Sequence, residues 1–323
     1  MSNGDKFATV MSLKVTNLTK IFDSNAAVNG ISFEVTEPSV VGFLGPNGAG
    51  KTTTMRIVTG FLKATSGTVT IDGETMSPDS FKLRSQIGYL PESNPLYPEL
   101  EVREFLQFAA ELAGMSPATE SERMDFVIER CSLKEVLFEP ISHLSKGYKQ
   151  RVGLAQAIVH DPKILILDEP TSGLDPNQVI EIRKLISELA REKFVILSTH
   201  ILSEVQALCD RVLIISEGKL VLDSSTSDLQ HRGTGNISIT LKTSSSLETV
   251  RSKIGESIRP VSMECDRKDE TVTVLLNTDD SDALREKIFD TCVSNGFKII
   301  ALTGGGSDLE ALFRKLTVGA DET

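Results

Sequence analysis

The stretch Val40-Val-Gly-Phe-Leu44, followed directly by Gly45-Pro-Asn-Gly-Ala-Gly-Lys-Thr52, decides the fold class. The apolar run 40–44 indicates a buried strand, and GxxxxGK[ST] between a strand and a helical run (53–62) is typical of a phosphate-binding loop, or P-loop. Its glycines let backbone N–H groups surround phosphate oxygens, and the following helix points its positive end at the anion. Lys51 would neutralise phosphate charge, and Thr52 would offer a hydroxyl to Mg²⁺.

A pair of acidic residues follows a second buried strand. Residues 164–167 are all apolar, and Asp168 and Glu169 come directly after them. The carboxyl ends of strands are where α/β sheets bind ligands. We therefore expect Asp168 to hold Mg²⁺, through water, and Glu169 to be the general base for an attacking water.

Residues 13–225 resemble an ABC-type (ATP-binding cassette) ATPase, because further motifs occur in the order of that family. Leu144-Ser-Lys-Gly-Tyr-Lys-Gln-Arg151 matches the family's signature sequence, and Ser172-Gly-Leu-Asp175 matches the loop that crosses between nucleotide sites. The resemblance implies that Phe22 stacks on adenine and that His200 contacts the γ-phosphate. It also assigns Gln86 the link from metal and water to a membrane partner.

The resemblance yields a complete set of expected site residues for ATP and Mg²⁺. The expected catalytic residues are Lys51, Gln86, Glu169 and His200, and the expected metal ligands are Thr52, Gln86 and Asp168. The expected contacts to ATP are Phe22, Gly45, Pro46, Asn47, Gly48, Ala49, Gly50, Lys51, Thr52, Thr53, Ser145, Gly147 and Asp175.

The signature departs from its commonest form, LSGGQ, at Lys146 and Tyr148. Ser145 still precedes a helix whose N-terminal N–H groups, with the backbone of Gly147, suit a γ-phosphate. In this family the signature completes the site of a second subunit. The resemblance therefore implies a head-to-tail dimer, either a homodimer or a heterodimer of two cassettes, with ATP at the interface.

The pattern predicts two domains. Residues 1–230 are expected to form an α/β P-loop ABC ATPase core with an antiparallel β subdomain and a helical subdomain at about 91–160. Residues 231–323 are expected to form a small α+β accessory domain of βαββαβ, ferredoxin-like order. Its expected elements are 237–241, 247–254, 259–264, 271–276, 281–294 and 297–302, with a last helix opened by the capping box Ser307-Asp-Leu-Glu310.

Composition indicates that any action at a membrane would be from the cytosolic side and through a partner. The net charge is −11 and the pI is about 5.0, which disfavours nucleic-acid binding. No run approaches the ~18 apolar residues of a membrane helix, and residues 1–10 lack a signal-peptide core. The four cysteines form no CxxC pair, as in reduced cytosolic proteins. Taken with the resemblance, this implies a cytoplasmic subunit held at the inner face of the membrane by an integral permease.

LSKGY with SGLDPNQ is similar to export-type ABC ATPases, including those of gliding machinery and of drug or polysaccharide exporters. The extension after residue 230 also resembles the accessory domain of that group. The alternative is a non-transport ABC ATPase acting on ribosomes or DNA. Ribosome-acting relatives usually carry two cassettes, and DNA-repair relatives carry long heptad insertions that 89–144 lacks. A P-loop kinase or GTPase would lack the signature and His200.

Overall fold

The computed structural model describes residues 12–232, 236–278, 282–303 and 313. Contacts divide the chain into two compact units, residues 1–224 and 225–323. The sequence had placed this boundary at 230. The final helix expected from the Ser307–Glu310 capping box lies outside the described residues.

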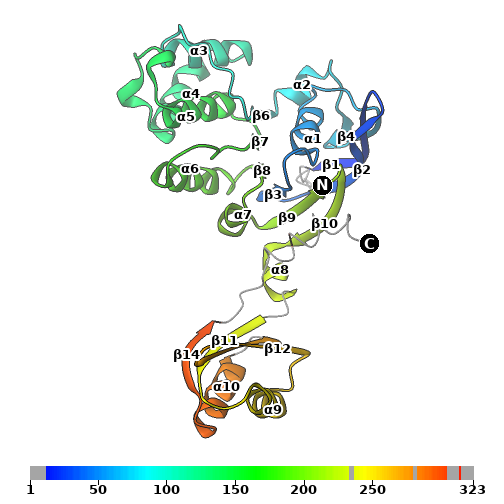
Figure 1. Ribbon diagram of the computed structural model, residues 1–323. Coiled ribbons are helices and arrows are strands. Elements are labelled where there is room, and N and C mark those ends of the chain that lie inside the picture. Colours follow the sequence, from blue (N-terminus) through cyan, green and yellow to red (C-terminus); the bar gives the residue numbers. More distant parts are fainter. Residues whose placement is uncertain (1–11, 233–235, 279–281, 304–312, 314–323) are drawn as a thin grey trace, which may run out of the picture. The chain divides into compact units, whose positions relative to one another are not determined.

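The first unit is built around a mainly parallel sheet that carries the P-loop strand at its centre (Figure 1). Its strand order is β10-β9-β3-β8-β7-β6. Residues 39–44 of β3 pair in parallel with β8 on one side and β9 on the other. Parallel strands that are buried on both faces are continuously apolar, as the 40–44 and 164–167 runs are. The strands are β6 (Ile87–Leu90), β3 (Ser39–Leu44), β7 (Ile164–Asp168), β8 (Phe194–Thr199), β9 (Arg211–Ser216) and β10 (Lys219–Ser225).

A second, antiparallel sheet has the order β2-β1-β4-β5, which confirms the expected antiparallel β subdomain. Its strands are β1 (Leu13–Phe22), β2 (Asn25–Val35), β4 (Ser66–Ile71) and β5 (Glu74–Thr75). The two sheets share one core, in which the rings of Phe33 and Phe43 lie 5.9 Å apart, centroid to centroid. Helices α1 (Lys51–Val58) and α2 (Phe81–Arg84) lie beside this sheet in Figure 1.

Three helices form a separate lobe of the first unit (Figure 1). They are α3 (Val102–Leu112), α4 (Pro117–Arg130) and α5 (Lys146–Ile158), and they contact one another, with the short 3₁₀ helices η1 (Lys134–Val136) and η2 (Ile141–His143) between α4 and α5. Helix α3 buries Val102, Phe105 and Leu106, which recur at helical spacing on one face. Helices α6 (Pro176–Leu189) and α7 (Leu202–Leu208) complete the unit.

The second unit begins with α8 (Thr226–Arg232) and has the βαββαβ order that the sequence predicts. The sheet order is β12-β13-β11-β14, and every pairing is antiparallel. The elements are β11 (Asn236–Lys242), α9 (Leu247–Ile258), β12 (Ser262–Lys268), β13 (Thr271–Asn277), α10 (Asp282–Ser294) and β14 (Lys298–Thr303). The inner faces form a core of this unit's own residues, including Ile237, Ile254 and Val274.

One boundary in this unit differs from the expectation. The sequence placed a strand at 259–264, whereas α9 continues to Ile258 and β12 begins at Ser262. Ile258 lies four residues after Ile254, so both side chains face the core and the helix gains a turn. Arg259 then ends the helix in the left-handed conformation, with φ 53°.

Candidate functional site

The P-loop crosses from the end of β3 to the start of α1 with no room for side chains at two glycines. A Cβ on Gly45 would lie 2.4 Å from the Ile215 carbonyl oxygen, and one on Gly50 would lie 2.3 Å from the Ala27 carbonyl oxygen. Gly50 also has φ 102°, a conformation that side-chain-bearing residues rarely adopt. The neighbouring backbone lies so close to these two positions that only glycine fits there. The loop therefore forms a tight cradle.

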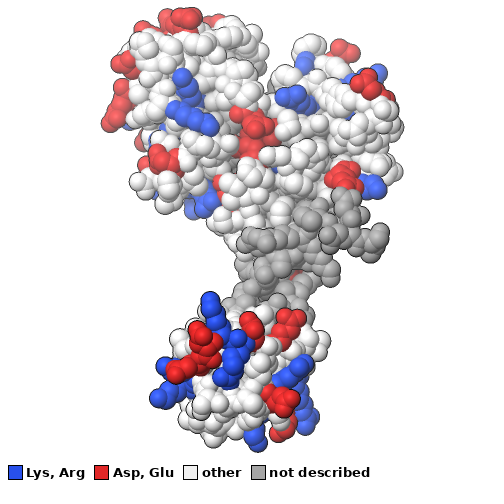
Figure 2. Space-filling model, in the orientation of Figure 1, with Lys and Arg blue, Asp and Glu red and all other residues white. Residues whose placement is uncertain are grey.

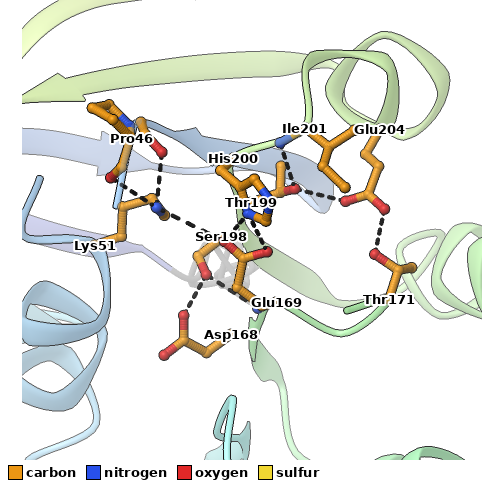
Figure 3. A network of polar contacts seen from close by, with 11 residues as sticks. Pro46, Lys51, Asp168, Glu169, Thr171, Ser198, Thr199, His200, Ile201 and Glu204 are labelled. Carbon is orange, nitrogen blue, oxygen red and sulfur yellow. Dashed lines mark hydrogen bonds and ion pairs between the residues drawn. The ribbon is translucent and has the colours of Figure 1, made fainter. Parts of the chain in front are cut away.

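Lys51, the first residue of α1, places its own ammonium group inside this cradle (Figure 3). Its Nζ donates to the carbonyl oxygens of Gly45 and Pro46 at 2.8 and 3.2 Å and lies 3.8 Å from Glu169 Oε1. The residue is only 6% exposed. Burial lowers the pKa of the ammonium, against the opposing charge of Glu169 and Asp168. The cation has two neutral acceptors and one distant carboxylate, so an incoming anion would find it incompletely paired.

The acidic pair lies at the carboxyl end of β7, as the sequence predicts. Asp168 is fully buried; its Oδ1 accepts a hydrogen bond from Ser198 Oγ, and its Oδ2 has no hydrogen-bond partner. Glu169 turns the chain away from the strand with φ 51°, and its backbone N–H donates to the Ser198 carbonyl at 3.1 Å. A left-handed residue other than glycine costs roughly 1–2 kcal/mol, and such strain concentrates at functional sites.

His200 meets Glu169 across the neighbouring strand end. Its Nδ1 lies 3.0 Å from both Glu169 carboxylate oxygens. Burial raises the pKa of the Glu169 carboxyl, while His200 and Lys51 act in the opposite direction. The arrangement gives a desolvated carboxylate, suited to accept a proton, between two nitrogen-bearing side chains.

These groups line a cavity of about 410 Å³ beside the P-loop. Its wall holds the P-loop residues Asn47, Gly48, Gly50, Lys51, Thr52 and Thr53, and also Glu169, His200, Ala27, Glu92 and Ser172. Asp168, Gly45, Pro46 and Ala49 lie beside this wall without lining it. The structure therefore brings together most of the cradle, base and histidine that were expected from the sequence.

The expected role of Gln86 is not supported, because this residue lies at the other end of β6. Gln86 precedes β6, and its carbonyl accepts from the backbone N–H groups of Lys163 and Ile164 at 3.0 Å each. A strand of four residues spans ~13 Å, so Gln86 and the acidic pair lie at opposite edges of the sheet. Glu92, which follows the carboxyl end of β6, lines the cavity instead. The direction of β6 was the signal that could have identified Glu92.

Phe22 stands apart from the cavity wall. It ends β1, is 46% exposed, and has Lys20 Nζ 5.0 Å from its ring centroid. An exposed ring is available for stacking. Its contact to adenine stays a prediction.

The signature and the crossing loop lie together, and of their residues only Ser172 lines the cavity of their own chain. Ser145 caps α5, and its Oγ accepts from the Tyr148 N–H at 3.3 Å. A Cβ on Gly147 would lie 2.4 Å from the Gln178 side chain, and the Lys146 side chain lies over Gly173. Asp175 caps α6 by accepting from the Gln178 N–H at 3.0 Å. Ser145, Gly147 and Asp175 do not line the 410 Å³ cavity.

The residues at the cradle fit a magnesium ion that arrives with a nucleotide. Among residues 12–232, 236–278, 282–303 and 313, no group of three or more His, Cys, Asp or Glu side chains could hold a metal. Mg²⁺ needs few protein ligands where substrate phosphates and waters supply the rest. The unpartnered Asp168 Oδ2 and the cavity-lining Thr52 match that requirement.

A P-loop after a central parallel strand, with an acidic pair and a histidine at the adjoining strand ends, defines a nucleoside-triphosphatase of the P-loop class. The model of the family "ABC transporter" matches residues 28–172. The chain is 33% identical to the linearmycin resistance ATP-binding protein LnrL of Bacillus subtilis over 94% of this chain and 98% of that protein.

Similarity extends to other relatives over the first unit. The chain is 40% identical to the bacitracin transport ATP-binding protein BcrA of Bacillus licheniformis, over 68% of this chain and 72% of that protein. It is similar in structure to MJ0796, a dimeric bacterial ABC transporter cassette, with TM-score 0.62 and 25% identity over 66% and 98% of the two chains. The chain belongs to the ABC transporter ATP-binding family and is an ATPase.

Proposed function

We propose that this ATPase drives an exporter by docking on a separate, membrane-spanning subunit. The observation that carries the proposal is an apolar groove of about 730 Å³ on the first unit. Phe81 and Leu112 on its wall are 73% and 72% exposed. Exposed apolar side chains that line one groove mark a protein-binding site. The relatives named for bacitracin transport and linearmycin resistance support a role in export.

The groove lies where motion at the nucleotide site would reach it. Its wall includes Ile87 and Tyr89 of β6, whose carboxyl end leads to Glu92 in the nucleotide cavity. It also includes Tyr97, Phe105 and Phe108, whose rings pack edge-on or tilted with centroids 5.6–5.8 Å apart. A partner helix bound in this groove would therefore contact residues that move with the segment that joins β6 to α3.

In the proposed cycle, each residue at the cradle has one role. Lys51 and the P-loop N–H groups bind the phosphates, Glu169 takes the proton of the attacking water, and His200 orients Glu169 and contacts the γ-phosphate. Asp168, Thr52 and, in place of Gln86, Glu92 face the region where Mg²⁺ would neutralise phosphate charge. Ser145 and Gly147 of a second subunit would close the site, which favours the ATP-bound dimer.

The proposed location follows from the proposed partner. We place the protein in the cytoplasm, held at the inner face of the membrane through the groove. The described residues include no helix long and apolar enough to cross a membrane. The small second unit is assigned an accessory role, because the nucleotide motifs all fall before residue 225.

Affinity purification from solubilised membranes tests this function. The wild-type chain should retain a polypeptide with several membrane helices, whereas Phe81→Ser with Leu112→Ser should lose it. Phe138→Ser is the matched control, because Phe138 is also an exposed aromatic residue but does not line the groove. All three proteins should hydrolyse ATP alike without the partner. Retention of ribosomal proteins or DNA, with no membrane polypeptide, would favour a non-transport role.

A further inference from the structure

Glu204 of α7 is a buried carboxylate that no motif explains. The residue is 2% exposed. Its Oε2 accepts from Thr199 Oγ1 at 2.7 Å, and its Oε1 accepts a hydrogen bond from Thr171 Oγ1 (Figure 3). Arg183 Nη2 of α6 lies 3.8 Å from Oε1. The carboxylate is therefore held mainly by two neutral hydroxyl groups, one at the end of β8 and one in the turn after β7.

The end of β8 and the turn after β7 also carry the proposed catalytic pair. Thr199 directly precedes His200, and its Oγ1 also accepts from the backbone N–H of Ile201 at 3.0 Å. The hydroxyl thus braces the backbone on both sides of His200. Thr171 lies two residues after Glu169 and directly before Ser172, which lines the cavity. Glu204 therefore joins the side chains of Thr171 and Thr199 behind the site.

The chemistry of this cluster favours a functional reason for it. A buried carboxylate is costly unless its hydrogen bonds are complete, and apolar residues of similar volume often stabilise a core better. Glu204 does not line the nucleotide cavity, so it cannot act on ATP itself. Its directional bonds, unlike apolar contacts, fix the Thr171 and Thr199 side chains at one separation.

We propose that Glu204 is a positioning residue that sets the spacing between Glu169 and His200. The inference rests on the roles proposed above for those two residues. Their contact of 3.0 Å spans the ends of β7 and β8, and each end is tied to the Glu204 carboxylate through a threonine. Glu204 should not affect nucleotide binding, because nucleotide binding depends on the P-loop.

Steady-state ATP hydrolysis by Glu204→Leu and Glu204→Gln tests the proposal. Leu keeps the volume but accepts no hydrogen bond, so kcat per nucleotide-binding site should fall by about tenfold to a hundredfold, as for other small misplacements of catalytic groups. KM for Mg·ATP should stay unchanged. Gln can still bond both hydroxyl groups and should restore most of kcat. Glu188→Leu is the matched control, because Glu188 of α6 pairs with Arg130 of α4 and does not line the nucleotide cavity.

The decisive measurement is the double variant with His200→Ala. If Glu204 acts through His200, Glu204→Leu should lower kcat little further in that background. A multiplicative loss, or an unchanged kcat in Glu204→Leu, would overturn the positioning role. An unchanged kcat in His200→Ala alone would instead contradict the proposed function of His200. If Glu204→Leu does not fold, Thr171→Val, which removes one donor without changing volume, decides by the same cycle.

Discussion

Replacing Glu169 by Gln removes the proposed base while keeping its size. The Glu169 carboxylate lies 3.0 Å from His200 Nδ1 and 3.8 Å from Lys51 Nζ, contacts that a Gln oxygen can retain in part. A general base contributes about 10²–10⁴ in rate. At 1.36 kcal/mol for each factor of ten, the barrier should rise by about 2.7–5.4 kcal/mol. Burst and steady-state hydrolysis of saturating Mg·ATP would measure this loss, while the Kd for ATP should change little.

The pH dependence gives the same variant a second test. Burial raises the pKa of Glu169 above its ordinary value of 4.5. The base works only when ionised, so wild-type kcat should fall as the pH drops through that raised pKa. Glu169→Gln should lose this acid limb together with the rate. An unchanged kcat, or an acid limb that survives the substitution, would refute the assignment of Glu169 as the base.

Four further perturbations test other parts of the site and fold. Lys51→Ala should abolish tight Mg·ATP binding, and tight binding by the variant in a titration would contradict this role. Because burial lowers the Lys51 pKa from its ordinary value of 10.5, the wild-type affinity for ATP should weaken as the pH rises, starting before pH 10.5 is reached. Gly50→Ala should bind ATP poorly and melt earlier, since its Cβ would lie 2.3 Å from the Ala27 carbonyl oxygen; an unchanged melting temperature would contradict the clash. Ser145→Arg should leave ATP binding by a monomer intact but stop turnover, and normal hydrolysis would refute the signature assignment. Truncation after Ser225 should leave a folded chain that binds ATP, because the first unit has its own core, and loss of binding would show that the units depend on each other.

The sequence predicted the parts of the site that occupy one continuous stretch. The P-loop, with its flanking strand and helix, and the Asp168–Glu169 pair each carry their context beside them, so their placement followed from local pattern. The βαββαβ order was likewise readable, because each strand and helix shows its own periodicity. The end of α9 was missed because the predicted helix stopped at Ile254, whereas Ile258, four residues later, continues its buried face.

Contacts between distant segments were harder to predict. Gln86 and Glu92 flank the same strand, and only the direction of β6 in the sheet decides which of them reaches the cavity. Glu204 is one glutamate inside a short helix, and nothing adjacent in sequence marks it. Its importance depends on Thr171 and Thr199, which approach it from the turn after β7 and from the end of β8. Such residues become visible only when the chain has been folded in space.

The geometry of the single chain also bears on how hydrolysis could be controlled. Lys51, Glu169 and His200 lie together in one chain, whereas Ser145 and Asp175 cap α5 and α6 and do not line the cavity beside their own P-loop. We infer that the cradle can bind ATP in a monomer, and that the helix terminus at Ser145 becomes part of a site only when a second subunit presents it. ATP would then gain contacts in the closed dimer that it lacks in the open one, which is the condition for a ligand to shift such an equilibrium. Hydrolysis removes the γ-phosphate, which both subunits would contact. The preference for the closed dimer should therefore end when ATP is hydrolysed.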